Sequence, residues 1–332
     1  MTGENVKHTD QYDPFVRGRF PVGVRTIQAL DTARDRLFPC EIWYPAATQY
    51  AGQDIAPETQ DVFTVPSRDT PRSQMAVRNA AAQPGTYPLI IFSHASGGGR
   101  RGATYLCTHL SSHGYVVAAL DHSEVVAAEL ARKDVETREQ KAALVEAVIA
   151  NRVPDIRFLL DHLLGSAFAC DPRAHARGCS PACKGGVEYA DTSVVVSNLD
   201  PTQIGIVGHS FGGWTALAAP EVEGRIRAVV ALAPGGIILR RADHMHFMDD
   251  VEQLHETTRT MPWTEELAWM PKEMRPIAEL CSGEQAHLFV RGLTLCHMDR
   301  ILRRPEEAQR FLAGDLEAEL AARGVDVIVH KP

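Results

Sequence analysis

Residues 208–212 (Gly-His-Ser-Phe-Gly) have the Gly-x-Ser-x-Gly pattern that is typical of a serine nucleophile. The apolar run at residues 204–207 predicts a buried strand directly before it, and residues 214–219 predict a helix directly after it. Between such a strand and helix the chain makes a sharp, strained turn, which lifts the serine hydroxyl above the sheet edge and requires small neighbours. We therefore predict Ser210 as the nucleophile.

A nucleophilic serine needs a general base, and in folds with this turn the acid and the histidine usually follow the serine in the chain. The histidines after Ser210 are His244, His246, His255, His287, His297 and His330. In one interpretation, residues 237–242 form the last strand, and His244 lies on the loop after it. In a second interpretation, Asp243 is the acid, and residues 288–290 form a final strand that leads to His297.

The residues around position 285 favour the first interpretation. Ser282 and Gln285 have the spacing of a helix capping box, which predicts a helix after them. The apolar residues that follow fit one helical face better than a strand. These residues are Ala286, Phe289, Val290, Leu293, Cys296 and Ile301. We therefore prefer His244 as the base, and His297 and His246 remain alternatives.

The segment before His244 is too short for a complete fold of this kind. Only residues 233–236 separate the strand predicted at 226–232 from the one predicted at 237–242. Parallel strands need a crossover of about a dozen residues. The strand at 237 must therefore turn back antiparallel, leave the sheet or be distorted. We expect an incomplete sheet edge and a Ser210–His244 separation beyond hydrogen-bond reach, unless an irregular path restores the contact.

The same short segment leaves no place for the acid that orients the histidine. Asp243, Asp249 and Asp250 are the carboxylates nearest in sequence, and none has the position that the fold normally uses. The identity of the triad acid therefore stays unknown at this point.

The rest of the chain predicts one domain, residues 1–332, with alternating strands and helices. Residues 23–29 and 38–44 predict two antiparallel strands, residues 46–86 an irregular surface excursion, and residues 87–93 and 115–120 two buried strands. Helical segments separate the buried strands, which indicates a mostly parallel, doubly wound sheet with flanking helices. Residues 251–280 predict a cap or lid over the site.

Four segments together resemble the dienelactone-hydrolase-like and platelet-activating-factor acetylhydrolase-like branch of the α/β-hydrolase superfamily. They are residues 38–45 (Phe-Pro-Cys-Glu-Ile-Trp-Tyr-Pro), 94–97 (His-Ala-Ser-Gly), 114–122 and 208–213. The likeness covers about residues 15–236 and 237–325. It implies that the backbone N–H groups of Ser96 and Phe211 form the oxyanion hole. The segment around His244 also resembles the histidine loop of that branch.

Composition excludes several other classes of protein. The net charge of −8 and the lack of a basic run argue against a nucleic-acid partner. No apolar stretch reaches the ~18 residues of a membrane span, and the N-terminus lacks the pattern of a signal peptide. We expect a soluble, cytoplasmic protein. Cys170, His175, Cys179 and Cys183 could bind zinc, but the spacing lacks a Cys-x2-Cys pair and favours a plain loop.

These observations predict a serine esterase that hydrolyses a small-molecule carboxylic ester through an acyl-enzyme intermediate, without a metal or organic cofactor. The missing acid supports an alternative, a hydrolase-fold protein that binds a small ligand and turns it over negligibly.

Overall fold

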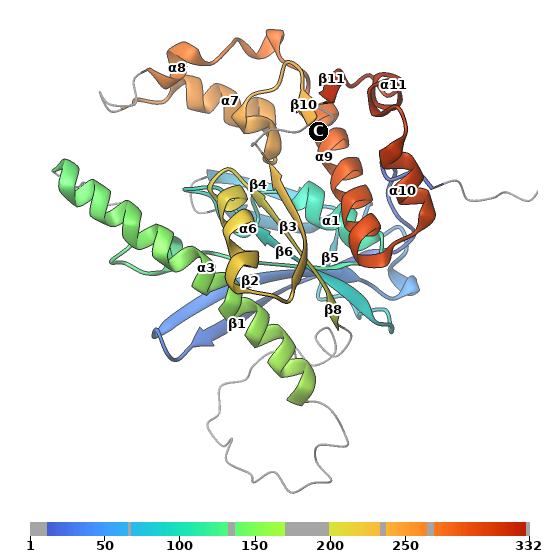
Figure 1. Cartoon of the computed structure of the whole chain (residues 1–332), viewed down its shortest axis with the longest axis horizontal. Helices are drawn as coiled ribbons and strands as arrows, with labels where there is room; N and C mark the ends of the chain where they lie inside the picture. The colour runs from blue at the N-terminus through green and yellow to red at the C-terminus, as the bar shows by residue number, and fades with distance from the viewer. Residues whose placement is uncertain are drawn as a thin grey trace, which may run out of the picture.

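The computed structural model describes residues 12–65, 68–131, 137–169, 199–232, 237–263 and 269–329. A seven-stranded sheet forms its centre (Figure 1). Its strands are β1 (Val22–Asp31), β2 (Arg36–Pro45), β5 (Val77–Arg78), β6 (Tyr87–Ser93), β7 (Val116–Leu120), β8 (Leu199–His209) and β9 (Ile226–Leu232). Across the sheet their order is β5-β1-β2-β7-β6-β8-β9. Strands β7, β6, β8 and β9 are parallel, and β1 and β2 form an antiparallel hairpin, as the sequence predicts.

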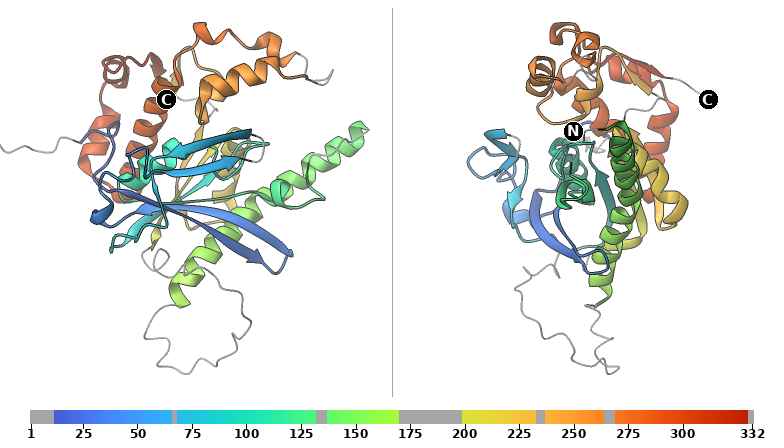
Figure 2. Two further views of the ribbon diagram at one scale, coloured as in Figure 1. Left: turned by 180° about the vertical axis from the view of Figure 1, so that it is seen from behind. Right: turned by 90° about the vertical axis from the view of Figure 1, so that its left-hand side faces the viewer.

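Helices cover both faces of this sheet (Figure 2). Strand β6 shows why, because its side chains alternate between two cores and all of them are buried. Ile90 and Phe92 belong to the core under α1 (Thr104–Ser112) and α9 (Gly283–Met298). Leu89 and Ile91 belong to the core under α3 (Arg138–Ala169) and α6 (Phe211–Val222). The α/β class and the doubly wound arrangement are confirmed.

The strand after β9 leaves the main sheet. Strand β10 (Ile237–Leu239) pairs antiparallel with β11 (Val327–Val329) in a separate two-stranded sheet. The prediction that this strand cannot pair in parallel beside β9 is confirmed. Among the described residues, β9 is the last strand of the main sheet on this side.

Two expectations about local structure have different outcomes. The prediction of an irregular excursion at residues 46–86 is wrong in part, because β3 (Asp61–Val65) and β4 (Arg68–Gln74) form a hairpin there. Its alternation is hidden in the sequence by the polar residues on both of its faces. The capping box of Ser282 and Gln285 is present, and residues 283–298 are helical. The alternative in which residues 288–290 form the final strand is therefore wrong.

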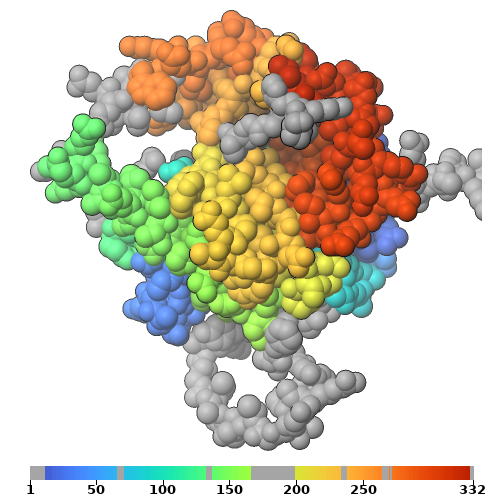
Figure 3. Space-filling model, viewed as in Figure 1, coloured from blue at the N-terminus to red at the C-terminus, as the bar shows by residue number. Residues whose placement is uncertain are grey.

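Short helices complete the described chain. They are η1 (Thr48–Tyr50), α2 (Ser123–Val126), η2 (His244–Phe247), α7 (Val251–Thr260), α8 (Met270–Glu273), η4 (Ile277–Glu279), η5 (Asp299–Arg303), α10 (Glu306–Ala313) and α11 (Leu316–Ala321). The N-terminal part of α3 and the segment that carries α7 and α8 project on the same side of the molecule (Figure 3). No helix of the described ranges combines the length and the apolar character that a bilayer span requires.

Candidate active site

Ser210 lies at the turn between β8 and α6, with φ 56° and ψ −118°. A residue other than glycine in this conformation is strained, and such strain persists only where the surrounding structure enforces it. The Ser210 N–H donates to the Leu232 carbonyl of β9 at 3.1 Å, and its own carbonyl accepts from Trp214 in the first turn of α6. The strand–turn–helix context predicted for this motif is therefore present.

The glycines on either side of Ser210 allow the turn to press against the end of β6. A Cβ atom on Gly212 would lie 2.0 Å from the Ser93 carbonyl oxygen and 2.7 Å from that of His94. A Cβ atom on Gly208 would lie 1.9 Å from the Gly212 carbonyl oxygen. These contacts bring the start of α6 against the strand end that leads into Ser96.

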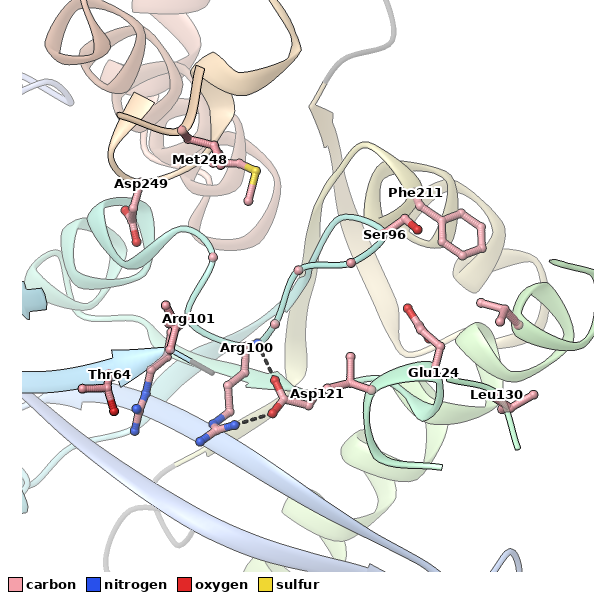
Figure 4. A pocket seen from close by; sticks show the side chains of 18 of the residues that line it. Thr64, Ser96, Arg100, Arg101, Asp121, Glu124, Leu130, Phe211, Met248 and Asp249 are labelled. Atoms are coloured by element: carbon pink, nitrogen blue, oxygen red, sulfur yellow. Dashed lines mark hydrogen bonds and ion pairs between the residues drawn. The ribbon is translucent and has the colours of Figure 1, made fainter. Parts of the chain in front are cut away.

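Ser96 and Phe211 line the same cavity, which has a volume of about 720 Å³ (Figure 4). In this view the two residues lie side by side, above Glu124 of α2. Their N–H groups are the two donors that the family resemblance implies for an oxyanion. Because α6 begins at Phe211, its free N-terminal N–H groups add a favourable field for negative charge there.

The walls of the cavity differ in character. Apolar side chains from α2, α3, α7 and the α2–α3 connection line one part of it, and charged side chains line another. The apolar residues include Val125, Leu130, Leu144, Val148 and Leu254, and the charged ones include Arg72, Arg100, Arg101, Asp121 and Asp249. The arginines are paired with carboxylates, for example Arg100 with Asp121 and Arg72 with Asp250. The cavity can therefore hold an amphiphilic small molecule beside Ser96 and Phe211.

His244, the predicted base, lies in η2 on the side of His209. The imidazole rings of His209 and His244 have centroids 4.8 Å apart, and His209 Nε2–H donates to the His244 carbonyl at 3.1 Å. Desolvation lowers the pKa of His244 below its usual value, although the nearby Asp243 opposes this shift. His244 is therefore neutral at pH 7, as a general base must be. Within the described ranges, no hydrogen bond joins Ser210 Oγ to His244.

The three acids considered from the sequence have other partners. Asp243 Oδ1 accepts from His246 Nδ1 at 2.9 Å, and Asp243 Oδ2 lies 2.8 Å from His255 Nε2. Asp249 caps α1, because its carboxylate accepts from the N–H groups of Thr104 and Tyr105. Asp250 pairs with Arg72. In the part of the chain that the structure describes, none of these carboxylates hydrogen-bonds to His244.

The other histidines considered as the base, and the possible zinc ligands, have partners elsewhere in the fold or lie outside the described residues. His246 is buried and donates to the Asp243 carboxylate and to the Cys281 carbonyl, so it is held inside the fold. His297 lies in α9 beside Val229 of β9. His330 and the cluster of Cys170, His175, Cys179 and Cys183 lie outside the described residues. Among the residues that are described, no three histidine, cysteine or acidic side chains are arranged to hold a metal ion.

A second serine–histidine–aspartate arrangement, which sequence reasoning missed, lies where β6 and β7 end against α3. Ser93 O–H donates to His122 Nε2 at 2.9 Å, and His122 Nδ1–H donates to Asp155 at 3.1 Å. Asp155 also accepts from the Ser123 N–H and hydroxyl. Ser93, His122 and Asp155 have no exposed surface, so substrate cannot reach them. The arrangement therefore ties the ends of β6 and β7 to α3. The only feature of the sequence that pointed to this arrangement was the position of His122 at the end of a predicted strand.

Several buried histidines make the stability of the fold depend on pH. Desolvation lowers the pKa of His94, His109 and His122, so these side chains are neutral in the folded protein. His246 behaves in the opposite way. Burial alone would lower its pKa, but the hydrogen bonds to Asp243 and Cys281 outweigh burial and raise it to about 10.

We expect the stability to be highest near pH 6.5. Below about pH 6.5 the unfolded chain binds protons at the three neutral histidines that the folded state rejects, so stability falls with pH. Above pH 6.5, the stabilisation by protonated His246 is lost as the pH rises toward its pKa of about 10. Urea midpoints measured from pH 5 to pH 10 test this, and His246→Asn should remove the alkaline decline. A midpoint that stays constant from pH 6.5 to 10 in the wild type would contradict the assignment.

Comparisons with known proteins show a similarity to acetylhydrolases over part of the chain. The family model for platelet-activating factor acetylhydrolase, isoform II, matches residues 14–153, which end before Ser210. Platelet-activating factor acetylhydrolase of Gallus gallus is 27% identical over 179 residues, which are 47% of this chain and 41% of that protein. The Cavia porcellus enzyme is 29% identical over 162 residues, which are 45% of this chain and 35% of that protein. The matches thus span 35–41% of the length of these two relatives.

A solved structure supports the fold over nearly the whole chain. A ferulic acid esterase from Streptomyces cinnamoneus superposes with a TM-score of 0.57 and covers 94% of this chain and 97% of that one. Its sequence is 20% identical, so this likeness supports the architecture alone. The sheet order, the turn at Ser210 and the solved structure agree on the architecture. The chain has the α/β-hydrolase fold, and its N-terminal part is similar to platelet-activating factor acetylhydrolases.

Proposed function

We propose that this chain is a serine hydrolase that cleaves a small-molecule carboxylic ester through an acyl-enzyme intermediate. The observation that carries the proposal is the strained backbone of Ser210 beside a cavity that Ser96 and Phe211 line. Strain of this kind is retained at functional sites, where it aims a reactive side chain. The similarity to acetylhydrolases that act on an ester agrees with this chemistry.

The reaction proceeds in two steps. Ser210 Oγ attacks the ester carbonyl carbon while His244 takes the hydroxyl proton, and the N–H groups of Ser96 and Phe211 donate to the resulting oxyanion. The carbon–oxygen bond to the alcohol then breaks, and the alcohol leaves with the proton from His244. In the second step a water molecule loses its proton to His244 and attacks the acyl carbon. The bond to Ser210 Oγ then breaks, His244 returns its proton to Oγ, and the carboxylic acid leaves.

The proposal includes a base without a carboxylate partner. Because no described carboxylate bonds to His244, its ring must be oriented by packing against His209. Turnover should therefore be slower than with a complete triad.

The proposal also includes a cap over the cavity, formed by residues 251–280. Leu254 of α7 in this segment lines the cavity. The cytoplasmic location stays a prediction from the sequence.

A second candidate function is ligand binding without turnover. It is favoured by the lack of a hydrogen bond between Ser210 Oγ and His244 among the described residues. The same cavity would then bind an amphiphilic molecule and release it unchanged.

Pre-steady-state hydrolysis of p-nitrophenyl acetate separates the two functions. An esterase with an acyl-enzyme intermediate releases a burst of p-nitrophenolate equal to the enzyme concentration when acylation by this activated ester is faster than deacylation. The Ser210→Ala variant should show no burst. Equal rates in the wild type and the variant would eliminate the esterase and leave the binding protein.

A further inference from the structure

Arg152 is a buried cation beside the candidate oxyanion hole. It lies in α3 with no exposed surface. Its Nη1–H donates to the His94 carbonyl oxygen at 2.7 Å, and its guanidinium carbon lies 4.4 Å from the centre of the Phe211 ring. His94 stands two residues before Ser96, and Phe211 itself supplies the second donor. One side chain therefore contacts both of the segments whose N–H groups would hold the oxyanion.

The surroundings of Arg152 do not suit a purely stabilising role. Its Nη2 pairs with Glu124 of α2, a residue that lines the cavity. Within the described ranges, Arg152 Nε and Glu124 Oε2 are both buried without a hydrogen-bond partner. Burying an ion pair costs desolvation free energy, and unsatisfied polar atoms add to that cost. A pair of this kind is weak evidence for stability and is better explained by the geometry that it holds.

A second contact fixes the same loop from the other side. The His122 N–H donates to His94 Nε2 at 3.1 Å, and His94 Nδ1–H donates to the Ala95 carbonyl at 2.7 Å. His122 is itself held by Asp155, which lies one helical turn after Arg152 in α3. The turn at His94 is thus held by α3 directly, through Arg152, and indirectly, through Asp155.

We propose that Arg152 is a positioning residue that aligns the Ser96 and Phe211 N–H groups for the oxyanion. The inference rests on the proposed function. The hydrogen bond from Arg152 to the His94 carbonyl fixes the position of the loop that carries Ser96. The planar guanidinium of Arg152 packs on the Phe211 ring and fixes its position at the start of α6. The N–H donors of an oxyanion hole lie about 2.7–3.1 Å from the oxyanion, and the loss of one donor lowers kcat about 10²–10³-fold. A displacement of both donors should therefore lower kcat and leave KM nearly unchanged.

The experiment uses three variants of the full chain. Arg152→Lys keeps the charge and a donor but lacks the planar face. Arg152→Met with Glu124→Gln removes both charges, so that no carboxylate is left buried alone. Arg157→Met alters an exposed arginine of the same helix and is the matched control. Steady-state hydrolysis of p-nitrophenyl acetate gives kcat and KM, and thermal unfolding reports the fold.

We expect the double variant to lose about 10–100-fold in kcat with KM changed less than about twofold, on the scale of losing part of one oxyanion donor. Arg152→Lys should lie between it and the wild type, and Arg157→Met should equal the wild type. If the double variant fails to fold, the kcat of Arg152→Lys alone tests the proposal. A folded double variant or Arg152→Lys with wild-type kcat would overturn the proposal, as would a loss confined to KM.

A readout without turnover separates this inference from the proposed function. Hydrogen exchange of the Ser96 and Phe211 amides should become faster in both Arg152 variants and stay unchanged in Arg157→Met, because the two segments lose their anchor. Unchanged exchange would overturn the positioning role even in an active enzyme. If the wild type shows no Ser210-dependent hydrolysis, the proposed function fails, and the exchange result still supports or rejects the positioning role.

Discussion

The His244→Ala variant should lose about 10²–10⁴-fold in kcat/KM for p-nitrophenyl acetate, the usual contribution of a general base. His244 lies beside His209 at the end of β8, and desolvation keeps its ring neutral at pH 7. His297→Ala is the matched control, because His297 lies in α9 beside β9. It should retain nearly all activity. Initial rates across a range of substrate concentrations give kcat/KM for both variants.

The opposite result would identify a different base. If His297→Ala loses activity and His244→Ala does not, His244 has no part in the reaction. The pH dependence gives a second check. With the pKa of His244 lowered by desolvation, kcat/KM of the wild type should fall only below about pH 6.5, the usual value for histidine. A profile that already falls from pH 8 would not fit this residue.

The Gly212→Ala variant should be destabilised by about 3 kcal/mol or more, at or above the upper end of the usual cost of overpacking. The new Cβ atom would meet the Ser93 carbonyl oxygen at 2.0 Å, and neither backbone can move without shifting β6 or α6. Activity should fall as well, because the same shift separates Ser96 from Phe211. Urea unfolding gives the free energy from the midpoint and slope.

Gly165→Ala provides the control for this substitution. Gly165 lies in α3 and is exposed, and a Cβ atom there meets nothing within 4 Å. Alanine should therefore stabilise the helix by about 0.5–1 kcal/mol. If Gly212→Ala were as stable as Gly165→Ala, the close contact between the nucleophile turn and the end of β6 would be wrong.

The parts of the fold that the sequence predicts are those that depend on local patterns. The buried strands appear as apolar runs, and the start of α9 appears as a capping box, because both signals lie within a few neighbouring residues. The hairpin of β3 and β4 is missed because polar side chains conceal its alternation. Strand β11 is missed because its three residues form a strand only by pairing with β10, about 90 residues earlier.

The candidate site divides in the same way. Ser210 is predicted from a motif whose steric demands are local, and the positive φ of that residue agrees with the prediction. The partners of Asp249 and Asp250 could not be predicted, because these partners, Thr104 and Arg72 among them, lie on distant segments. The contacts of His122 with Ser93 and with Asp155, and of Arg152 with His94, likewise join residues far apart in the chain. A single sequence contains no signal for such pairs.

The central claim is that Ser210 is the reactive nucleophile of this chain. A fluorophosphonate probe forms a stable bond to an activated serine, and peptide mass mapping locates the modified residue. We expect one equivalent of label on the peptide that contains Ser210, at a rate that falls sharply below pH 6.5, and no label in Ser210→Ala. Wild-type protein that stays unlabelled, or a label that remains in Ser210→Ala, would contradict the account.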